Sequence, residues 1–187
     1  DEKLTAKMHK AIAICQFKAE GQRIMAHPEY KLDQRLLLDK INWQEGTVTV
    51  EGNVYPLRDT NFPTVDPENP YAFTEEEQEV MNSLEASILN SDKLQEHIRF
   101  LYSHGALYTK ANGNLLYHGC IPMTDEGEFE EVEINGSRYK GKGLMDYLDD
   151  QVRKAYFSPS EAKESGRLGD LMWYLWLGGN SPLFGKD

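Results

Sequence analysis

The chain has 187 residues, of which 40% are hydrophobic and 27% charged, a composition typical of a globular domain and unlike that of a disordered tail. Its net charge of -11 repels phosphate backbones, so nucleic acids and anionic membranes are not expected partners, although bound cations could still attract an anionic substrate. The two cysteines, Cys15 and Cys120, lie too far apart in sequence to form a disulfide framework and favour a reducing, cytoplasmic location. The longest apolar run, residues 171–177, is far shorter than the ~20 residues of a membrane span.

Apolar residues at helical spacing predict a long helix at the start of the chain, ended by Pro28. The residues that share its predicted apolar face are Leu4, Met8, Ile12, Cys15 and Ala19. Residues 35–41 predict a short helical segment, and residues 47–57 predict a β-hairpin that turns at residues 51–53. Three prolines within residues 58–71 indicate a loop.

Thr74 and Glu77 have the spacing of a capping box, which predicts a helix running to about Asn90. Ser91 is a candidate cap for a second helix that ends at residues 104–105. Two hairpins follow, at residues 106–118 and 131–139, because Asn-Gly pairs separate short apolar strands. The helical stripe Leu144, Leu148, Val152 and Tyr156 predicts another helix, and the apolar run at residues 168–177 predicts a buried one.

His118 is the residue most open to a chemical interpretation. It follows the predicted apolar strand at residues 114–117 and precedes Gly119, which would let a ligand approach closely. The alternative is a structural histidine satisfied by a backbone hydrogen bond, and no second ligand lies near it in sequence. Spacing alone favours the structural interpretation.

The other candidate side chains favour structural roles. His97 and His104 are two helical turns apart, about 11 Å, which is too far to share one metal ion. His9 and His27 belong to the first helix and its end, Cys15 lies on an apolar face, and Cys120 is a lone thiol. These residues therefore add no catalytic constellation to His118.

Four stretches of the chain resemble one enzyme family, the class III fructose-1,6-bisphosphatases. They are Arg35-Leu-Leu-Leu-Asp-Lys-Ile41, Asp59-Thr-Asn-Phe-Pro-Thr-Val-Asp66, Asn114-Leu-Leu-Tyr-His-Gly-Cys-Ile-Pro122, and Met172-Trp-Tyr-Leu-Trp176 with Asn180-Ser-Pro-Leu-Phe-Gly-Lys-Asp187. The resemblance covers nearly the whole chain in order. It implies an α+β fold of long helices and short β-hairpins that is part of the αββα sandwich of calcineurin-like metallophosphatases.

The resemblance also implies a division of the chain and one metal ligand. Residues 1–105 correspond to a mostly helical insertion with a β-hairpin, and residues 106–187 to part of the metallophosphatase core. Of the family's metal-binding motifs only a His-Gly element matches, at His118-Gly119, so the resemblance makes His118 a metal ligand. The catalytic and substrate-binding residues remain unassigned, and we expect the 187-residue chain to be an internal piece that is inactive alone.

The chemistry implied by the resemblance is hydrolysis of fructose 1,6-bisphosphate to fructose 6-phosphate and phosphate in gluconeogenesis. A dinuclear site of divalent metal, expected to be Mn²⁺, would activate a hydroxide as the nucleophile. The implied partners are the sugar bisphosphate and the remainder of the same polypeptide, and the oligomeric state stays open. Two alternatives also stay open: a non-catalytic interaction or structural domain, and a metallophosphatase for phosphoproteins or nucleotides.

Overall fold

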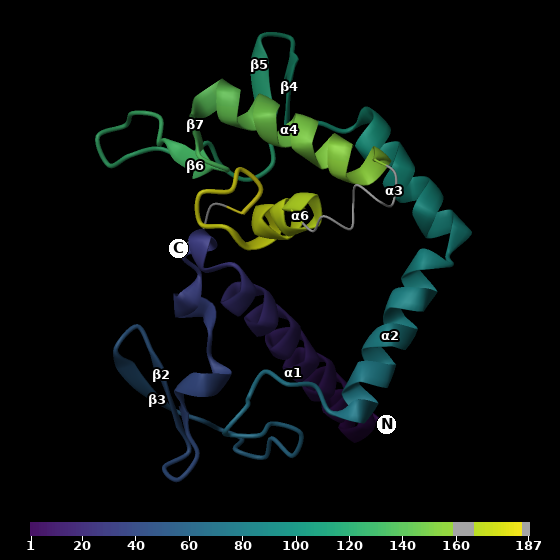
Figure 1. Cartoon of the computed structure of the whole chain (residues 1–187), viewed down its shortest axis with the longest axis vertical. Helices are drawn as coiled ribbons and strands as arrows, with labels where there is room; N and C mark the ends of the chain where they lie inside the picture. The colour runs from purple at the N-terminus through teal and green to yellow at the C-terminus, as the bar shows by residue number, and fades with distance from the viewer. Residues whose placement is uncertain (159–166, 185–187) are drawn as a thin grey trace. The chain divides into compact units, whose positions relative to one another are not determined.

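The chain is a mixed α+β protein that divides into two compact units, Asp1–Asn90 and Ser91–Asp187. The structure, a computed structural model, describes residues 1–158 and 167–184. Within these ranges the chain forms five α-helices and three small antiparallel sheets (Figure 1). None of the described helices is long and apolar enough to cross a membrane.

The first unit begins with the long helix α1 (Glu2–Ala26). Asp1 caps it by accepting a hydrogen bond from the backbone N–H of Lys3, and Pro28 lies just beyond its end. Three 3-10 turns follow: η1 (Pro28–Tyr30), η2 (Asp33–Arg35) and η3 (Leu38–Lys40). The predicted helical segment at residues 35–41 is therefore two short 3-10 turns, because the extended backbone of Leu36 interrupts any longer helix.

A three-stranded antiparallel sheet completes the β-structure of the first unit. It consists of β1 (Ile41–Asn42), β2 (Thr47–Val50) and β3 (Asn53–Pro56) in the order β1-β2-β3. Glu51 and Gly52 both have positive φ, as the two-residue turn of this hairpin requires. The predicted hairpin is confirmed, and so is the loop at residues 58–71, which contains no helix or strand.

The capping box predicted from Thr74 and Glu77 is present at the start of α2 (Glu75–Leu89). Glu77 has a second contact, because the ammonium group of Lys18 lies 2.6 Å from its carboxylate. Lys18 is fully buried and also donates a hydrogen bond to the carbonyl of Thr64. This buried ion pair connects α1, the proline-rich loop and the first turn of α2.

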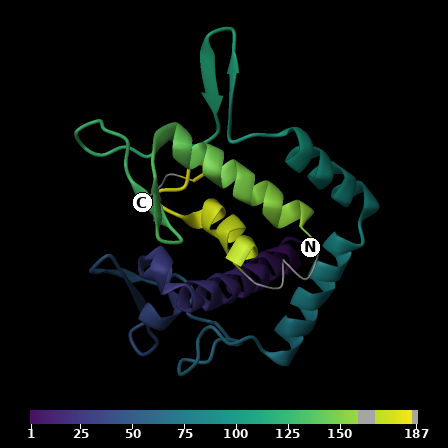
Figure 2. The same ribbon diagram turned by 45° about the horizontal axis from the view of Figure 1, so that its top comes forward.

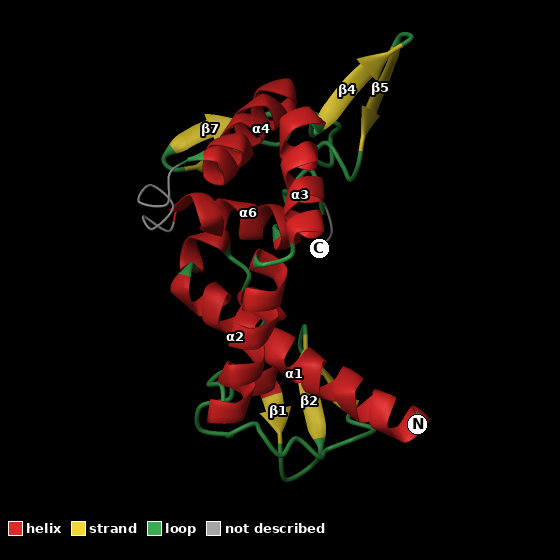
Figure 3. Ribbon diagram, turned by 90° about the vertical axis from the view of Figure 1, so that its right-hand side faces the viewer, coloured by secondary structure: helices red, strands yellow, loops and turns green. Residues whose placement is uncertain are grey.

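The second unit begins with α3 (Asp92–His104), whose N-cap residue Ser91 makes no side-chain capping bond. Two hairpins follow: β4 (Tyr108–Ala111) pairs with β5 (Asn114–Tyr117), and β6 (Val132–Ile134) pairs with β7 (Ser137–Tyr139). The β4–β5 hairpin projects away from the rest of its unit (Figures 2 and 3). All four residues of β5 are exposed, so this strand is not the packed apolar strand that its sequence suggests.

The core of the second unit lies between α4 (Gly141–Phe157), α6 (Arg167–Leu177) and the β6–β7 hairpin. Its buried residues are Val132, Ile134, Leu144, Leu148, Leu171 and Leu175. The predicted stripe of α4 is confirmed at Leu144 and Leu148. The prediction of a buried helix at residues 168–177 is confirmed at Leu171, Leu175 and Leu177 and is wrong at Trp176, which is 70% exposed.

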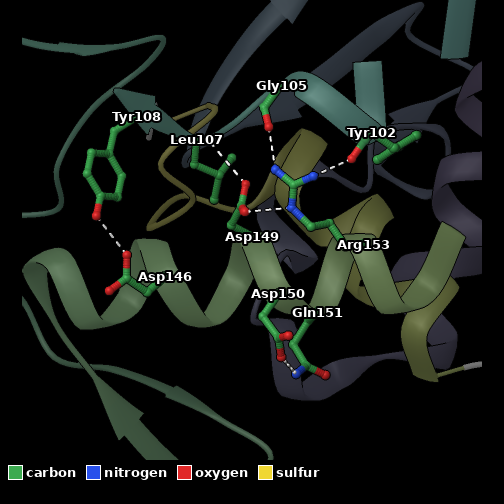
Figure 4. A network of polar contacts seen from close by, with 9 residues as sticks. All are labelled: Tyr102, Gly105, Leu107, Tyr108, Asp146, Asp149, Asp150, Gln151 and Arg153. Carbon is green, nitrogen blue, oxygen red and sulfur yellow. Dashed lines mark hydrogen bonds and ion pairs between the residues drawn. The ribbon is translucent and has the colours of Figure 1, made fainter. Parts of the chain in front are cut away.

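A polar network fixes the end of α3 against α4 (Figure 4). The guanidinium group of Arg153 donates hydrogen bonds to the backbone carbonyls of Tyr102 and Gly105 and to the carboxylate of Asp149, 2.9 Å away. Carbonyls at a helix C-terminus lack partners within the helix, so this arginine satisfies them. Helix α3 accordingly belongs to the second unit. The expected boundary at residue 105, between a family-specific insertion and the metallophosphatase core, stays a prediction.

Candidate functional site

His118 lies at a bend immediately after β5, where the exposed hairpin returns to the body of its unit. Asn112 and Gly113 both have positive φ and form the tight turn that sets the hairpin register. The His118 side chain is exposed and makes no hydrogen bond or ion pair within the described part of the chain. Its imidazole is therefore accessible to a ligand, and its role stays a prediction.

The two residues after His118 pack closely against the loop that follows α6. The backbone N–H of Cys120 donates a hydrogen bond to the carbonyl of Pro182 at 3.0 Å, and the Cys120 thiol lies 3.5 Å from the carbonyl of Ser181. A Cβ atom on Gly119 would lie 2.4 Å from the carbonyl oxygen of Pro182 and 2.8 Å from the carbonyl carbon of Leu183. Only glycine allows the two backbones to approach this closely.

The loop that receives Gly119 and Cys120 is well anchored. Ser181 and Pro182 are fully buried, and Leu183 packs against the core of the second unit. Consequently two of the stretches that carry the family resemblance, at residues 114–122 and 180–184, meet in space. Residues 185–187 of that second stretch lie outside the described residues.

Among the described residues, the two thiols and His104 have surroundings of an ordinary structural kind. Burial raises the pKa of Cys120, and burial together with the nearby carboxylate of Glu77 raises the pKa of Cys15, so both thiols stay protonated and unreactive near neutral pH. His104 stacks on Phe100 on the surface of α3. The structural interpretation of these residues stays a prediction.

The described residues offer one candidate metal ligand, His118. An exposed histidine with a free imidazole at a strand end is a suitable donor for a divalent metal. Within residues 1–158 and 167–184, however, no group of three His, Cys, Asp or Glu residues is arranged to hold a metal ion. His118 could thus serve as one ligand of a site, not as a complete site.

Comparison with known proteins decides the family. A sequence model of the family described as Firmicute fructose-1,6-bisphosphatase matches residues 1–187. The chain belongs to this family. A relative described as a class 3 fructose-1,6-bisphosphatase in Clostridium tetani (strain Massachusetts / E88) is 54% identical over 100% of this chain. Another of the same description in Clostridium novyi (strain NT) is 53% identical over 98% of this chain. A relative of the same description in Alkaliphilus metalliredigens (strain QYMF) is 53% identical over 100% of the chain.

The matching region is only part of each of these fructose-1,6-bisphosphatases. The chain spans 28% of the length of each of the three relatives. No solved structure matches the chain. The family resemblance inferred from four short stretches is confirmed over the whole chain, while the assignment of His118 as a metal ligand stays a prediction.

Sequence reasoning missed the residues that support His118 in this family member. The sequence indicates Gly119 only as a residue that would let a ligand approach, whereas its closest neighbours in the structure are the backbone atoms of Pro182 and Leu183. Ser181 lies in one of the stretches that carry the family resemblance, but its local sequence does not predict its burial, because burial depends on the fold. The Lys18–Glu77 pair was also missed, although the capping box had already placed Glu77 at the start of α2.

Proposed function

We propose that this chain is part of a fructose-1,6-bisphosphatase, a phosphoric monoester hydrolase that converts fructose 1,6-bisphosphate to fructose 6-phosphate and phosphate in gluconeogenesis. The observation that carries the proposal is family membership across residues 1–187. Identities of 53–54% over nearly the whole chain to proteins described as class 3 fructose-1,6-bisphosphatases support it. The two free cysteines are consistent with a place in the reducing cytoplasm.

In this proposal His118 contributes one neutral imidazole ligand to a dinuclear metal site. Residues 106–187 would belong to the metallophosphatase core, an αββα sandwich, and residues 1–105 would be an insertion into it. Manganese fits a site of oxygen and imidazole ligands. When bound, divalent metals would polarise the phosphate and lower the pKa of a water molecule.

The role of this chain's own residues is to present the imidazole. Exposure of His118 leaves it accessible to a metal and to a phosphate ester, and the Gly119–Pro182 contact fixes the backbone beside it. The acidic surface, with a net charge of -11, would repel a sugar bisphosphate in the absence of metal cations. Substrate binding in this scheme therefore depends on the metals.

A substrate panel tests the proposed activity. A full-length protein of the family that contains this segment is incubated with Mn²⁺ and with fructose 1,6-bisphosphate, a phosphoserine peptide or a nucleotide monophosphate, and released phosphate is measured. We expect release from the sugar bisphosphate. Preferential hydrolysis of the peptide or the nucleotide would assign another phosphoester, and no hydrolysis of any of them would favour a non-catalytic domain.

The isolated 187-residue chain provides a second arm of the same assay. Because the described residues offer no group of three metal ligands, the chain alone should release no phosphate above background even with Mn²⁺. Metal-dependent release of phosphate by the purified chain would show that a working site is built from its own residues.

A further inference from the structure

The first half of α1 presents an apolar row that the rest of its unit leaves largely uncovered. Leu4, Met8 and Ile12 follow one another at steps of four residues, and they are 57%, 62% and 44% exposed. These turns extend past the strands of the same unit (Figure 3). The charged residues at positions 3–12 are all lysines, so this end of the helix is basic. An exposed apolar row beside charges of one sign is typical of a surface that binds a partner.

Helix α2 presents a similar row with the opposite charge. Val80 and Leu84 are 50% and 42% exposed, and Ile88 continues their spacing of four residues. Every charged residue of α2 is a glutamate. A hollow of about 400 Å³ on this helix is lined by Glu76, Glu79, Val80, Ser83 and Leu84. Acidic and apolar side chains therefore share one face of α2, which fits a partner that is both basic and apolar.

The two rows match each other in spacing and in charge. Rows of residues four apart form the ridges that interdigitate in the commonest class of helix packing. Contact of α1 with α1, or of α2 with α2, would place like charges together, whereas contact of α1 with α2 places lysines opposite glutamates. Both rows are exposed in the same chain, so they do not cover each other there. The complementary surface for α1 is then α2 of another copy.

We propose that residues 3–12 of α1 dock on α2 of a second copy of this chain. A two-fold axis makes the contact twice, because α2 of the first copy receives α1 of the second. The inference goes beyond the proposed function, since it uses neither His118 nor a metal. The competing occupant is the remainder of a full-length polypeptide, because the chain spans 28% of the length of its relatives. The experiment separates these two occupants.

Reversal of the charges on each helix is the first step of the test, and self-association of this chain is measured by sedimentation velocity over a concentration series. One variant carries Lys3→Glu and Lys7→Glu, and the other carries Glu76→Lys and Glu79→Lys. All four residues are exposed, so circular dichroism should show an unchanged helix content. We expect the wild type to form a dimer. In each variant the dissociation constant of the dimer should rise by about a hundredfold, because both copies of the contact then oppose like charges.

An equimolar mixture of the two variants is the deciding measurement. In a mixed dimer each helix again meets the opposite charge, so we expect the wild-type affinity to return. Both variants keep a negative net charge, because the wild-type value of -11 exceeds the change, and general attraction between them does not explain such a recovery. A contact between α1 and α2 inside one chain would give no recovery on mixing. The matched control, Lys93→Glu with Arg99→Glu, makes the same charge change at exposed positions of α3 and should keep the wild-type dissociation constant.

The same variants in a full-length protein of the family that contains this segment identify the occupant there. We expect weaker self-association in each variant and its recovery in the mixture. Self-association that responds to neither variant would show that the remainder of the polypeptide covers these helices, and it would overturn the inference. A wild-type chain that stays monomeric throughout the concentration series, a mixture without recovery, or an equal effect of the control on α3 would also overturn it.

Discussion

Substitution of Gly119 by alanine tests the closest backbone contact in the candidate site. The new Cβ atom would lie 2.4 Å from the carbonyl oxygen of Pro182, whereas ordinary contacts begin near 3.4 Å, so one of the two backbones must move by about 1 Å. The atoms it meets belong to the backbone, and no side chain can rotate away to relieve the clash. Overpacking of this kind costs about 1–3 kcal/mol. Movement of the loop would also weaken the hydrogen bond from Cys120 to Pro182.

Urea unfolding of this chain measures the effect, and variants are compared where the slope of the unfolding free energy against urea concentration is unchanged. We expect Gly119→Ala to lower the unfolding free energy by about 1–3 kcal/mol. The control is Gly143→Ala, the same chemical change in α4, where a Cβ atom would meet nothing within 4 Å. Alanine there should stabilise the helix by about 0.5–1 kcal/mol. Equal stability of Gly119→Ala and the wild type would refute the close approach of the two backbones.

Two further predictions concern the polar contacts of the separate units. Lys18→Ala leaves Glu77 buried without its partner and should cost about 3–5 kcal/mol in urea unfolding, and a loss below about 1 kcal/mol would contradict the buried pair. Burial alone would raise the pKa of Glu77, but hydrogen bonds from Lys18 and from the residues around it lower the pKa below 4.5 on balance. The ionised Glu77 carboxylate therefore stabilises the fold above about pH 4.5, and this stabilisation is lost as the pH falls through the lowered pKa of the folded protein. In Lys18→Ala the unfolding free energy should depend less on pH in this range. Arg153→Lys cannot satisfy two carbonyls and a carboxylate together and should lower stability by about 1–3 kcal/mol, and an unchanged thermal midpoint would contradict this role.

Local chemistry explains which parts of the fold could be predicted from sequence. The turns at residues 51–52, 112–113 and 135–136 have the positive φ angles that Asn-Gly and Glu-Gly pairs adopt, so the hairpins followed from a few adjacent residues. The capping box at Thr74 and the stripe of α4 are equally local signals. These elements form where the sequence predicts them because their determinants lie within one or two turns of chain.

Burial could not be predicted in the same way, because it depends on partners distant in sequence. The apolar stripe predicted for α1 is exposed at Leu4, Met8 and Ile12, while the charged Lys18 on the same helix is fully buried. Lys18 is buried because Glu77 and the carbonyl of Thr64 lie beside it. Helical periodicity identifies an apolar face but does not show which part of that face another element covers.

The candidate site shows the same limit. Spacing alone left His118 open to a structural role, and the family resemblance supplied its interpretation as a ligand. The structure adds that residues 118–120 lie against residues 181–183. The two segments are far apart in sequence: the Cys120 thiol donates a hydrogen bond to the carbonyl of Ser181, 61 positions further along the chain. No local pattern around Ser181 indicates that contact, so only the fold could reveal it.

The most direct test of the account is the metal content of the His118→Ala variant of a full-length family protein that contains this segment. Bound manganese, measured by elemental analysis after removal of free metal, is compared with that of the wild type and of His104→Ala, whose imidazole stacks on Phe100 at the surface. We expect His118→Ala to lose bound manganese together with release of phosphate from fructose 1,6-bisphosphate, and His104→Ala to retain both. A His118→Ala protein that keeps its manganese and its rate would contradict the assignment of His118 as a metal ligand.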